Sequence, residues 1–400
     1  MPESPPALRN TSRLAPAFDN QDEQFSAAFS ILREAISERS FPAASTAVTY
    51  QARLVAVKSF GACVYPEPGA PLPTDFGRSG SGQVSPATLF DVASLTKPVA
   101  TTTMAMILYE RGQLELDAPI GAIIPEFTRG QSDARRRSVT FRHLLAHCSG
   151  LPAYEKLFLK ACSRDELLHE AFSTPLMSDP VSHAKYSDIG FIILGAALER
   201  VSEESLDAFC QREIFGPLGM SNTTFNPPAA LREQIPPTAD ERQESCGSDT
   251  PVGQHRTFRN RIIRGEVQDE NAFVLGGIAG HAGLFSTAND MARYAETMLA
   301  GGNPILLPET ISLFTRRESA PPDTSRTLGW DTPSTPSQSG KHLGPRSYGH
   351  LGYTGTSLWI DPDRQLSITL LTNRTWPDCS NQAIQQVRPK FHDAIVEAFS

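Results

Sequence analysis

Apolar side chains recur at helical spacing in several segments of the chain. Residues 23–39 carry apolar positions three or four apart, which predicts an amphipathic helix. The same spacing, bounded by capping and turn residues, predicts further helices. They cover residues 96–111, 141–147, 164–172, 188–201, 205–215, 289–299 and 381–399, the last with an irregularity at Pro389.

Strand-like runs lie near both ends of the chain. Segments rich in β-branched residues predict a hairpin at 45–50 and 54–60, and a second pair of strands at 357–360 and 366–371. Because helices fill the middle, we predict an α/β (α+β) fold with an antiparallel sheet from the N- and C-terminal segments, flanked by helices, and an inserted, mainly helical region. The expected divisions are a loose N-terminal arm at 1–22, a sheet region at 23–95 and 280–400, and a helical region at 96–279, with the active site between the last two.

Turn-forming residues interrupt these elements. Residues 66–82 predict a long surface loop, 226–258 an irregular segment, and 319–346, with five prolines, a flexible insertion. A glycine-rich run at 275–283 does not have the spacing of a dinucleotide-binding loop and follows no clear strand–helix unit. We therefore expect no dinucleotide, and no other cofactor.

Composition narrows the possible partners. The chain has 400 residues, of which 40% are hydrophobic and 20% charged, and its net charge is −8. This balance predicts a soluble globular protein and, without a basic stripe, no nucleic-acid partner. The apolar run at 190–198 is far shorter than the roughly 20 residues of a membrane span. Oligomeric state is left open.

Cellular location rests on two weaker signals. Residues 1–6 show neither the basic nor the apolar part of a signal peptide, so we expect a cytoplasmic protein, or an exported one whose leader lies outside this sequence. None of the six cysteines is spaced as C-x-x-C, and we expect separate free thiols, which favour a reducing compartment. They are Cys63, Cys148, Cys162, Cys210, Cys246 and Cys379.

Ser94-Leu95-Thr96-Lys97 carries the clearest chemistry. A serine hydroxyl is a weak nucleophile until a base lies within hydrogen-bond reach. Residues three apart share a helix face, so Lys97 would lie beside Ser94. A second match, Ser182 to Lys185, follows Pro180 in a segment without helical character and is interpreted as a loop coincidence.

Two later segments offer partners for this motif. Tyr186-Ser187-Asp188 precedes a helix; the phenol can relay a proton, and the carboxylate can cap the helix or accept from a lysine. In the second segment, His350-Leu351-Gly352-Tyr353, a turn feeds an edge strand. There Gly352 would let a substrate backbone approach, and the N–H of Tyr353 would join that of Ser94 as an oxyanion donor.

With these motifs in this order, the chain resembles the serine β-lactamase and penicillin-binding protein superfamily, including class C β-lactamases, DD-peptidases and related esterases. The resemblance covers about residues 25–398 and implies an acyl-enzyme on Ser94. Lys97 and Tyr186 would share proton transfer, and which of them is the base stays open. Asp188, His350, Gly352 and Tyr353 would line the substrate site.

Two departures bear on the substrate. Asp188 stands where the superfamily has Asn, and His350 where it has Lys. A mostly neutral imidazole holds a substrate carboxylate poorly. We therefore expect a serine hydrolase acting on small esters or amides, most like an esterase, with a β-lactamase, a D-Ala-D-Ala carboxypeptidase, an acyltransferase to another acceptor or a non-turnover penicillin sensor as alternatives.

Other histidines give weaker signals. His143 and His147 are spaced four apart, as metal ligands on one helix face would be, but no third ligand motif accompanies them. Packing roles are expected for both, and a structural role for His281 in the glycine-rich run. No metal is expected.

Overall fold

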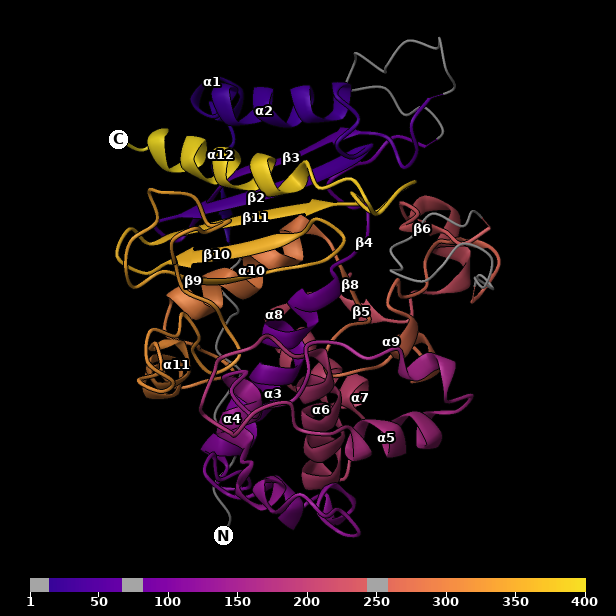
Figure 1. Ribbon diagram of the computed structural model, residues 1–400. Helices are drawn as coiled ribbons and strands as arrows, with labels where there is room; N and C mark the ends of the chain where they lie inside the picture. The colour runs from indigo at the N-terminus through magenta and orange to yellow at the C-terminus, as the bar shows by residue number, and fades with distance from the viewer. Residues whose placement is uncertain (1–13, 67–81, 243–257) are drawn as a thin grey trace, which may run out of the picture.

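A six-stranded sheet brings the two ends of the chain together. In the computed structural model, which describes residues 14–66, 82–242 and 258–400, its strand order is β1-β3-β2-β11-β10-β9 (Figure 1). All neighbours are antiparallel except β1 and β3. The strands are β1 (Ala15–Pro16), β2 (Ala43–Tyr50), β3 (Arg53–Gly61), β9 (Tyr348–Leu351), β10 (Ser357–Asp361) and β11 (Leu366–Thr372).

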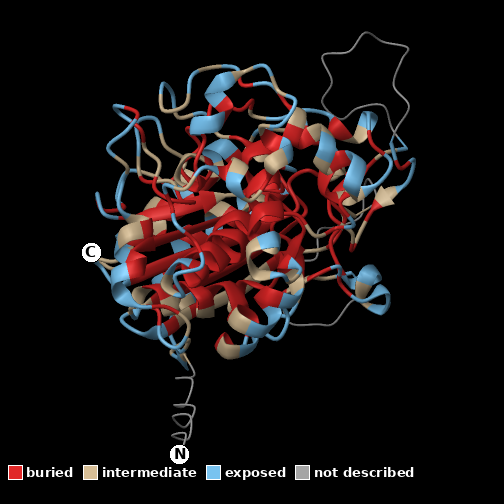
Figure 2. Ribbon diagram, turned by 90° about the horizontal axis from the view of Figure 1, so that it is seen from below, coloured by how far each residue is buried: buried red, intermediate tan, exposed pale blue. Residues whose placement is uncertain are grey.

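Helices cover both faces of this sheet. Helices α2 (Ser26–Ser37) and α12 (Ile384–Glu397) lie on one face, and α10 (Ala288–Leu299) lies on the other (Figure 1). Every residue of β11 is buried as a result. Apolar side chains of α2 and α12 form one core cluster with the sheet, and Figure 2 shows the buried residues concentrated in the middle of the molecule.

A mainly helical region follows, packed around α6 (Asp188–Ser202). Its other helices are α3 (Thr103–Glu110), α4 (Phe141–Leu145), α5 (Arg164–Ser173), α7 (Leu206–Cys210), α8 (Gly216–Leu218), α9 (Glu270–Val274) and α11 (Pro308–Thr315). A small sheet of β4 (Phe90–Asp91), β8 (Leu284–Ser286) and β5 (Thr224–Phe225) links the two regions, and β6 (Ala239–Asp240) and β7 (Ile262–Ile263) form another small sheet.

The predicted fold class is confirmed, and the differences are local. The arm at 1–22 is not loose where it is described, because Ala15–Pro16 pairs with β3 and Gln21–Gln24 forms α1. Residues 67–81 of the predicted loop lie outside the described residues. Residues 243–257 of the predicted irregular segment also lie outside the described residues. The earlier part of that segment contains a 3-10 helix at Ala229–Gln234 and strand β6. Helices α9 and α11 were not predicted.

The helix predicted at 96–111 begins as a π-helix, Lys97–Thr102, before it becomes α3. Proline has no N–H and leaves helical hydrogen bonding incomplete. Here the carbonyl of Pro98 accepts the Thr103 hydroxyl at 3.0 Å and the Tyr294 hydroxyl at 3.2 Å. Side chains thus satisfy a carbonyl in the wider turn.

The cysteines differ from the expectation at one described position. Cys63, Cys148, Cys162 and Cys210 are free thiols, whereas Cys379 is disulfide-bonded. Spacing alone gives no pairing, so this bond could not be predicted from the sequence. Across the described ranges, no helix is both long and apolar enough to cross a bilayer.

We expect Phe29→Ala to lower the free energy of unfolding by about 3–5 kcal/mol, because it empties a fully buried position where α2 packs on the sheet. Denaturant unfolding followed by circular dichroism measures the change. Phe29→Leu, which keeps most of the volume, should cost less than Phe29→Ala, and equal losses would contradict a cavity effect.

Candidate active site

Ser94 lies in a tight turn between β4 and the helical run. The turn is a 3-10 helix, Ala93–Leu95, and Ala93 adopts a left-handed φ of +48°. Non-glycine residues rarely adopt this conformation, so the surrounding contacts must hold it. The Asp91 carboxylate accepts the Ala93 N–H at 2.8 Å, and the Thr96 hydroxyl donates to the Ala93 carbonyl at 2.7 Å.

Lys97 is fully buried, and its Nζ has three polar neighbours from separate parts of the fold. They are Ser94 Oγ at 2.9 Å, Asp188 Oδ1 at 2.6 Å and the His281 carbonyl oxygen at 3.0 Å. The rings of Tyr186 and Phe191 complete the surroundings, with centroids 4.8 and 5.6 Å from Nζ. The amino group of Lys97 is therefore removed from water but keeps three polar contacts.

Tyr186 brings a second polar atom to the serine. Its Oη lies 2.6 Å from Ser94 Oγ. Ser187 is the N-cap of α6, because its hydroxyl accepts the Gly190 N–H, and the Asp188 carboxylate is left to contact Lys97. The His147 ring packs against the rings of Tyr186 and Phe191, with centroids 4.7 and 4.9 Å away, and its Nδ1 accepts the Ser187 N–H at 3.0 Å.

The glycine-rich segment supplies the His281 carbonyl. The His281 imidazole is buried and lies 2.7 Å from Asp269, which also caps α9. Gly195 of α6 and Gly280 approach so closely that a Cβ on Gly195 would lie 2.9 Å from the Gly280 Cα. The segment thus rests directly on the helix that begins with Asp188.

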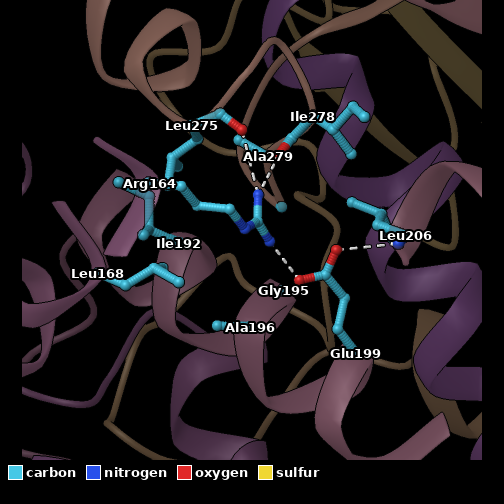
Figure 3. A pocket seen from close by; sticks show the side chains of 11 residues that line it. Arg164, Leu168, Ile192, Gly195, Ala196, Glu199, Leu206, Leu275, Ile278 and Ala279 are labelled. Carbon is cyan, nitrogen blue, oxygen red and sulfur yellow. Dashed lines mark hydrogen bonds and ion pairs between the residues drawn. The ribbon is translucent and has the colours of Figure 1, made fainter. Parts of the chain in front are cut away.

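Arg164 anchors the same segment from the other side. Its guanidinium donates to the carbonyls of Leu275 and Ile278 at 3.1 and 3.2 Å, and it pairs with Glu199 (Figure 3). Glu199 in turn accepts the Leu206 N–H at 2.9 Å. These residues line a small pocket to which Ser94 and Lys97 do not contribute.

The turn after β9 lies against the serine's segment. Thr354 and Thr356 donate their hydroxyls to the carbonyls of Asp91 and Val92 at 2.7 and 2.9 Å. A Cβ on Gly352 would lie 1.9 Å from Thr356 Oγ1 and 2.6 Å from the Val92 carbonyl oxygen. Packing within the chain therefore requires this glycine, and its predicted contact with substrate stays a prediction.

Burial determines the charge states at the site. It lowers the pKa of Lys97 despite the opposing effect of Asp188, and it raises the pKa of Tyr186 well above its ordinary value, with Asp188 adding to the rise. Burial, Lys97 and Arg326 hold the pKa of His350 well below its usual range. His350 Nδ1 donates to the Leu351 carbonyl at 2.8 Å, and this imidazole is neutral at pH 7.

A serine that contacts both a buried lysine and a tyrosine agrees with the family suggested by the motifs. The family described as Beta-lactamase matches residues 24–387.

The chain belongs to the beta-lactamase family. Among curated relatives, it is 34% identical to the "Putative D-alanyl-D-alanine carboxypeptidase" of Escherichia coli K12, over 72% of this chain and 69% of that protein. It is 32% identical to the "N-acetylmuramyl-L-alanine amidase" of Bacillus subtilis, over 72% and 68%.

Solved structures support the beta-lactamase-like fold. EstCE1, a hydrolase with promiscuous acyltransferase activity, matches with a TM-score of 0.73 and 20% identity, over 94% of this chain and 99% of that one. A penicillin-binding protein homologue from Caulobacter crescentus matches with a TM-score of 0.68 and 17% identity, over 94% and 98%.

Within this family fold, the structure brings together Ser94, Lys97, Tyr186 and Asp188. His350 lies next to them, with its ring centroid 6.0 Å from that of Tyr186. Sequence reasoning missed Asp91, Asp269 and Arg326. The Arg326 guanidinium lies 5.7 Å from the Tyr186 ring centroid, although its segment between α11 and β9 shows no periodic pattern.

The competing motifs have structural explanations. Ser182 lies in a turn and Lys185 in the irregular segment that follows it, which agrees with the expected loop. His143 takes part in the capping box of α4, and His147 in the packing described above. Over the described ranges, no group of three or more His, Cys, Asp or Glu residues could hold a metal.

We expect Asp91→Asn to cost about 1–3 kcal/mol of stability near pH 7, because the two carboxylate oxygens accept the N–H groups of Ala93 and Gln268, and an amide nitrogen cannot accept. Burial raises the pKa of Asp91 to about 6, so the folded state binds its proton more tightly than the unfolded state does. The free energy of unfolding of the wild type should therefore contain a contribution that decreases as the pH rises from about 4 to about 6. Asp91→Asn should lack this contribution.

Denaturant unfolding of both proteins at several pH values measures the difference. A parallel pH dependence in the two would contradict the assignment.

Proposed function

We propose that this protein hydrolyses small esters or amides through an acyl-enzyme on Ser94. The supporting observation is the contact of one hydroxyl with two proton-transfer groups, Lys97 Nζ at 2.9 Å and Tyr186 Oη at 2.6 Å.

Lys97 acts as the base in this proposal. As a neutral amine it donates two N–H bonds, to Asp188 and to the His281 carbonyl, and its lone pair accepts the Ser94 proton. The lowered pKa of Lys97 favours that form, whereas the raised pKa of Tyr186 disfavours a phenolate. Ser94 Oγ then attacks the substrate carbonyl carbon as its proton passes to Nζ.

Tyr186 returns the proton. Its hydroxyl donates a proton to the leaving-group oxygen or nitrogen. Lys97, which holds the proton taken from Ser94 and has its Nζ 4.8 Å from the Tyr186 ring centroid, then returns that proton to the phenolate oxygen. The N–H groups of Ser94 and Tyr353 bind the developing oxyanion, supported by the packing of residues 352–356 against Asp91 and Val92. Water then attacks the acyl-enzyme and gives a proton to Lys97, and Lys97 returns that proton to Ser94 Oγ as the bond between Oγ and the acyl carbon breaks.

His350 stands where the family's third motif has lysine, and its neutral imidazole holds a substrate carboxylate poorly. This residue therefore favours substrates without a carboxylate at that point. Arg326 supports a second candidate, cleavage of a peptide with a free carboxylate, because its guanidinium lies beside the Tyr186 ring where a leaving group departs. The name of the Escherichia coli relative agrees with this second candidate.

A substrate panel tests both candidates. We expect p-nitrophenyl esters to be hydrolysed, and Ser94→Ala to reduce kcat by about a thousandfold or more because the nucleophile is removed. Ser182→Ala, in the second S-x-x-K match, is the matched control and should keep full activity.

The other substrates of the panel distinguish the alternatives. Strong turnover of a D-Ala-D-Ala peptide would favour the second candidate, and turnover of a chromogenic cephalosporin would favour a β-lactamase. A stable acyl adduct without turnover would favour a sensor. Equal activity in wild type and Ser94→Ala would refute the proposal.

The role of Lys97 has its own test in Asp188→Asn. Asp188 raises the pKa of Lys97, so removal of its charge should lower that pKa further. The acidic limb of the kcat/KM profile should move down by about one to three pH units. Ester hydrolysis from pH 4 to 10 measures the profile, and an unmoved or raised acidic limb would exclude Lys97 as the base.

A further inference from the structure

Glu270 is a carboxylate without a cationic partner at the edge of the candidate active site. Within the described ranges it interacts with its own N–H and with the Tyr154 hydroxyl, 3.4 Å from Oε2, and no lysine or arginine pairs with it. Arg259, whose charge acts on it, is paired with Glu241. A half-buried carboxylate is ordinarily paired, so this one has capacity for a ligand.

Chain connectivity places Glu270 near the reacting serine. Its neighbour Asp269 holds His281, whose carbonyl contacts Lys97. In the same way, Tyr154 follows Ala153, whose carbonyl accepts the Asp188 N–H at 2.8 Å. Glu270 and Tyr154 are therefore each one residue away from a group that is fixed to the Lys97 site.

Tyr353 approaches from the turn after β9. It follows Gly352, which packs on Val92. Burial raises the pKa of Tyr353, the Arg374 guanidinium opposes the rise, and the charge of Glu270 adds to it. Tyr154, which contacts the carboxylate, is 36% exposed, and Tyr353 is 46% exposed although the Arg374 guanidinium lies 4.4 Å from its ring centroid. A carboxylate with accessible aromatic rings is suited to an ammonium group, which binds both.

Glu270 begins α9, and Arg326 lies in the segment that follows α11. Helix α9 lies to the right of β4 and β8 in Figure 1, and α11, which precedes the Arg326 segment, lies to the left. Arg326 flanks Tyr186, the proposed donor to the leaving group. With the leaving group assigned to the Arg326 side, the inference assigns the acyl part of the substrate to the side of α9, which Glu270 begins.

We propose that Glu270 is a specificity-determining residue that binds a protonated or quaternary amine on the acyl part of the substrate. This inference rests on the proposed acyl-enzyme function and names its substrate class. Burial and Asp269 raise the pKa of Glu270 to about 7, and a bound cation would stabilise its charged form.

Matched substrates isolate the charge. One series consists of p-nitrophenyl esters whose acyl chain of two to four carbons ends in trimethylammonium, and the other ends in the equally shaped tert-butyl group. For wild type we expect at least one chain length to show a tenfold or greater preference in kcat/KM for the cation, mainly through KM. Glu270→Gln, which keeps the shape and removes the charge, should reduce this preference about tenfold and leave the neutral esters unaffected.

Glu155→Gln is the control, because Glu155 is an exposed acid next to Tyr154. It should retain the preference. No preference in wild type, a preference that survives Glu270→Gln, or an equal loss in Glu155→Gln would each overturn the inference. If instead the neutral esters are not hydrolysed, or are hydrolysed equally by Ser94→Ala, the proposed function itself fails.

Discussion

The burial of one amino group constrains the arrangement of the whole site. Lys97 is fully buried, and its Nζ can lie there only because acceptors arrive from distant segments: Asp188 from the start of α6 and the His281 carbonyl from the glycine-rich segment. A buried amine without such partners would cost several kcal/mol. The helical region, the sheet region and the serine's own turn therefore meet at this atom.

The same burial shifts the pKa values of Lys97 and Tyr186 in opposite directions. Desolvation disfavours the charged form of each, so it lowers the pKa of the lysine and raises that of the tyrosine. In the proposed mechanism these shifts favour a lysine that accepts a proton and a tyrosine that donates one. His147, whose ring packs against Tyr186, and His350, whose pKa burial holds well below its usual range, have no step in that mechanism.

Local spacing predicted the parts of the site that lie within one helical turn. Ser94 and Lys97 needed only helix geometry, and the main helices and strands followed from apolar periodicity. Asp91, Asp269 and Arg326 were missed because their roles depend on contacts between segments far apart in sequence, such as the hydrogen bond from Gln268 N–H to Asp91. The π-helix at 97–102 and the disulfide of Cys379 likewise depend on tertiary contacts. Asp269 stands directly before the short helix α9, where a carboxylate can cap the helix. This position was the one sign of Asp269 in the sequence.

The contact between Gly195 and Gly280 bears on the spacing of the two acceptors of Lys97. Because no side chain separates α6 from the glycine-rich segment, the two backbones touch, and a side chain at either glycine would push them apart. The Asp188 carboxylate and the His281 carbonyl are carried by these two elements. Two missing side chains, neither of them near Ser94 in the sequence, therefore decide how closely these acceptors can surround the Lys97 amino group.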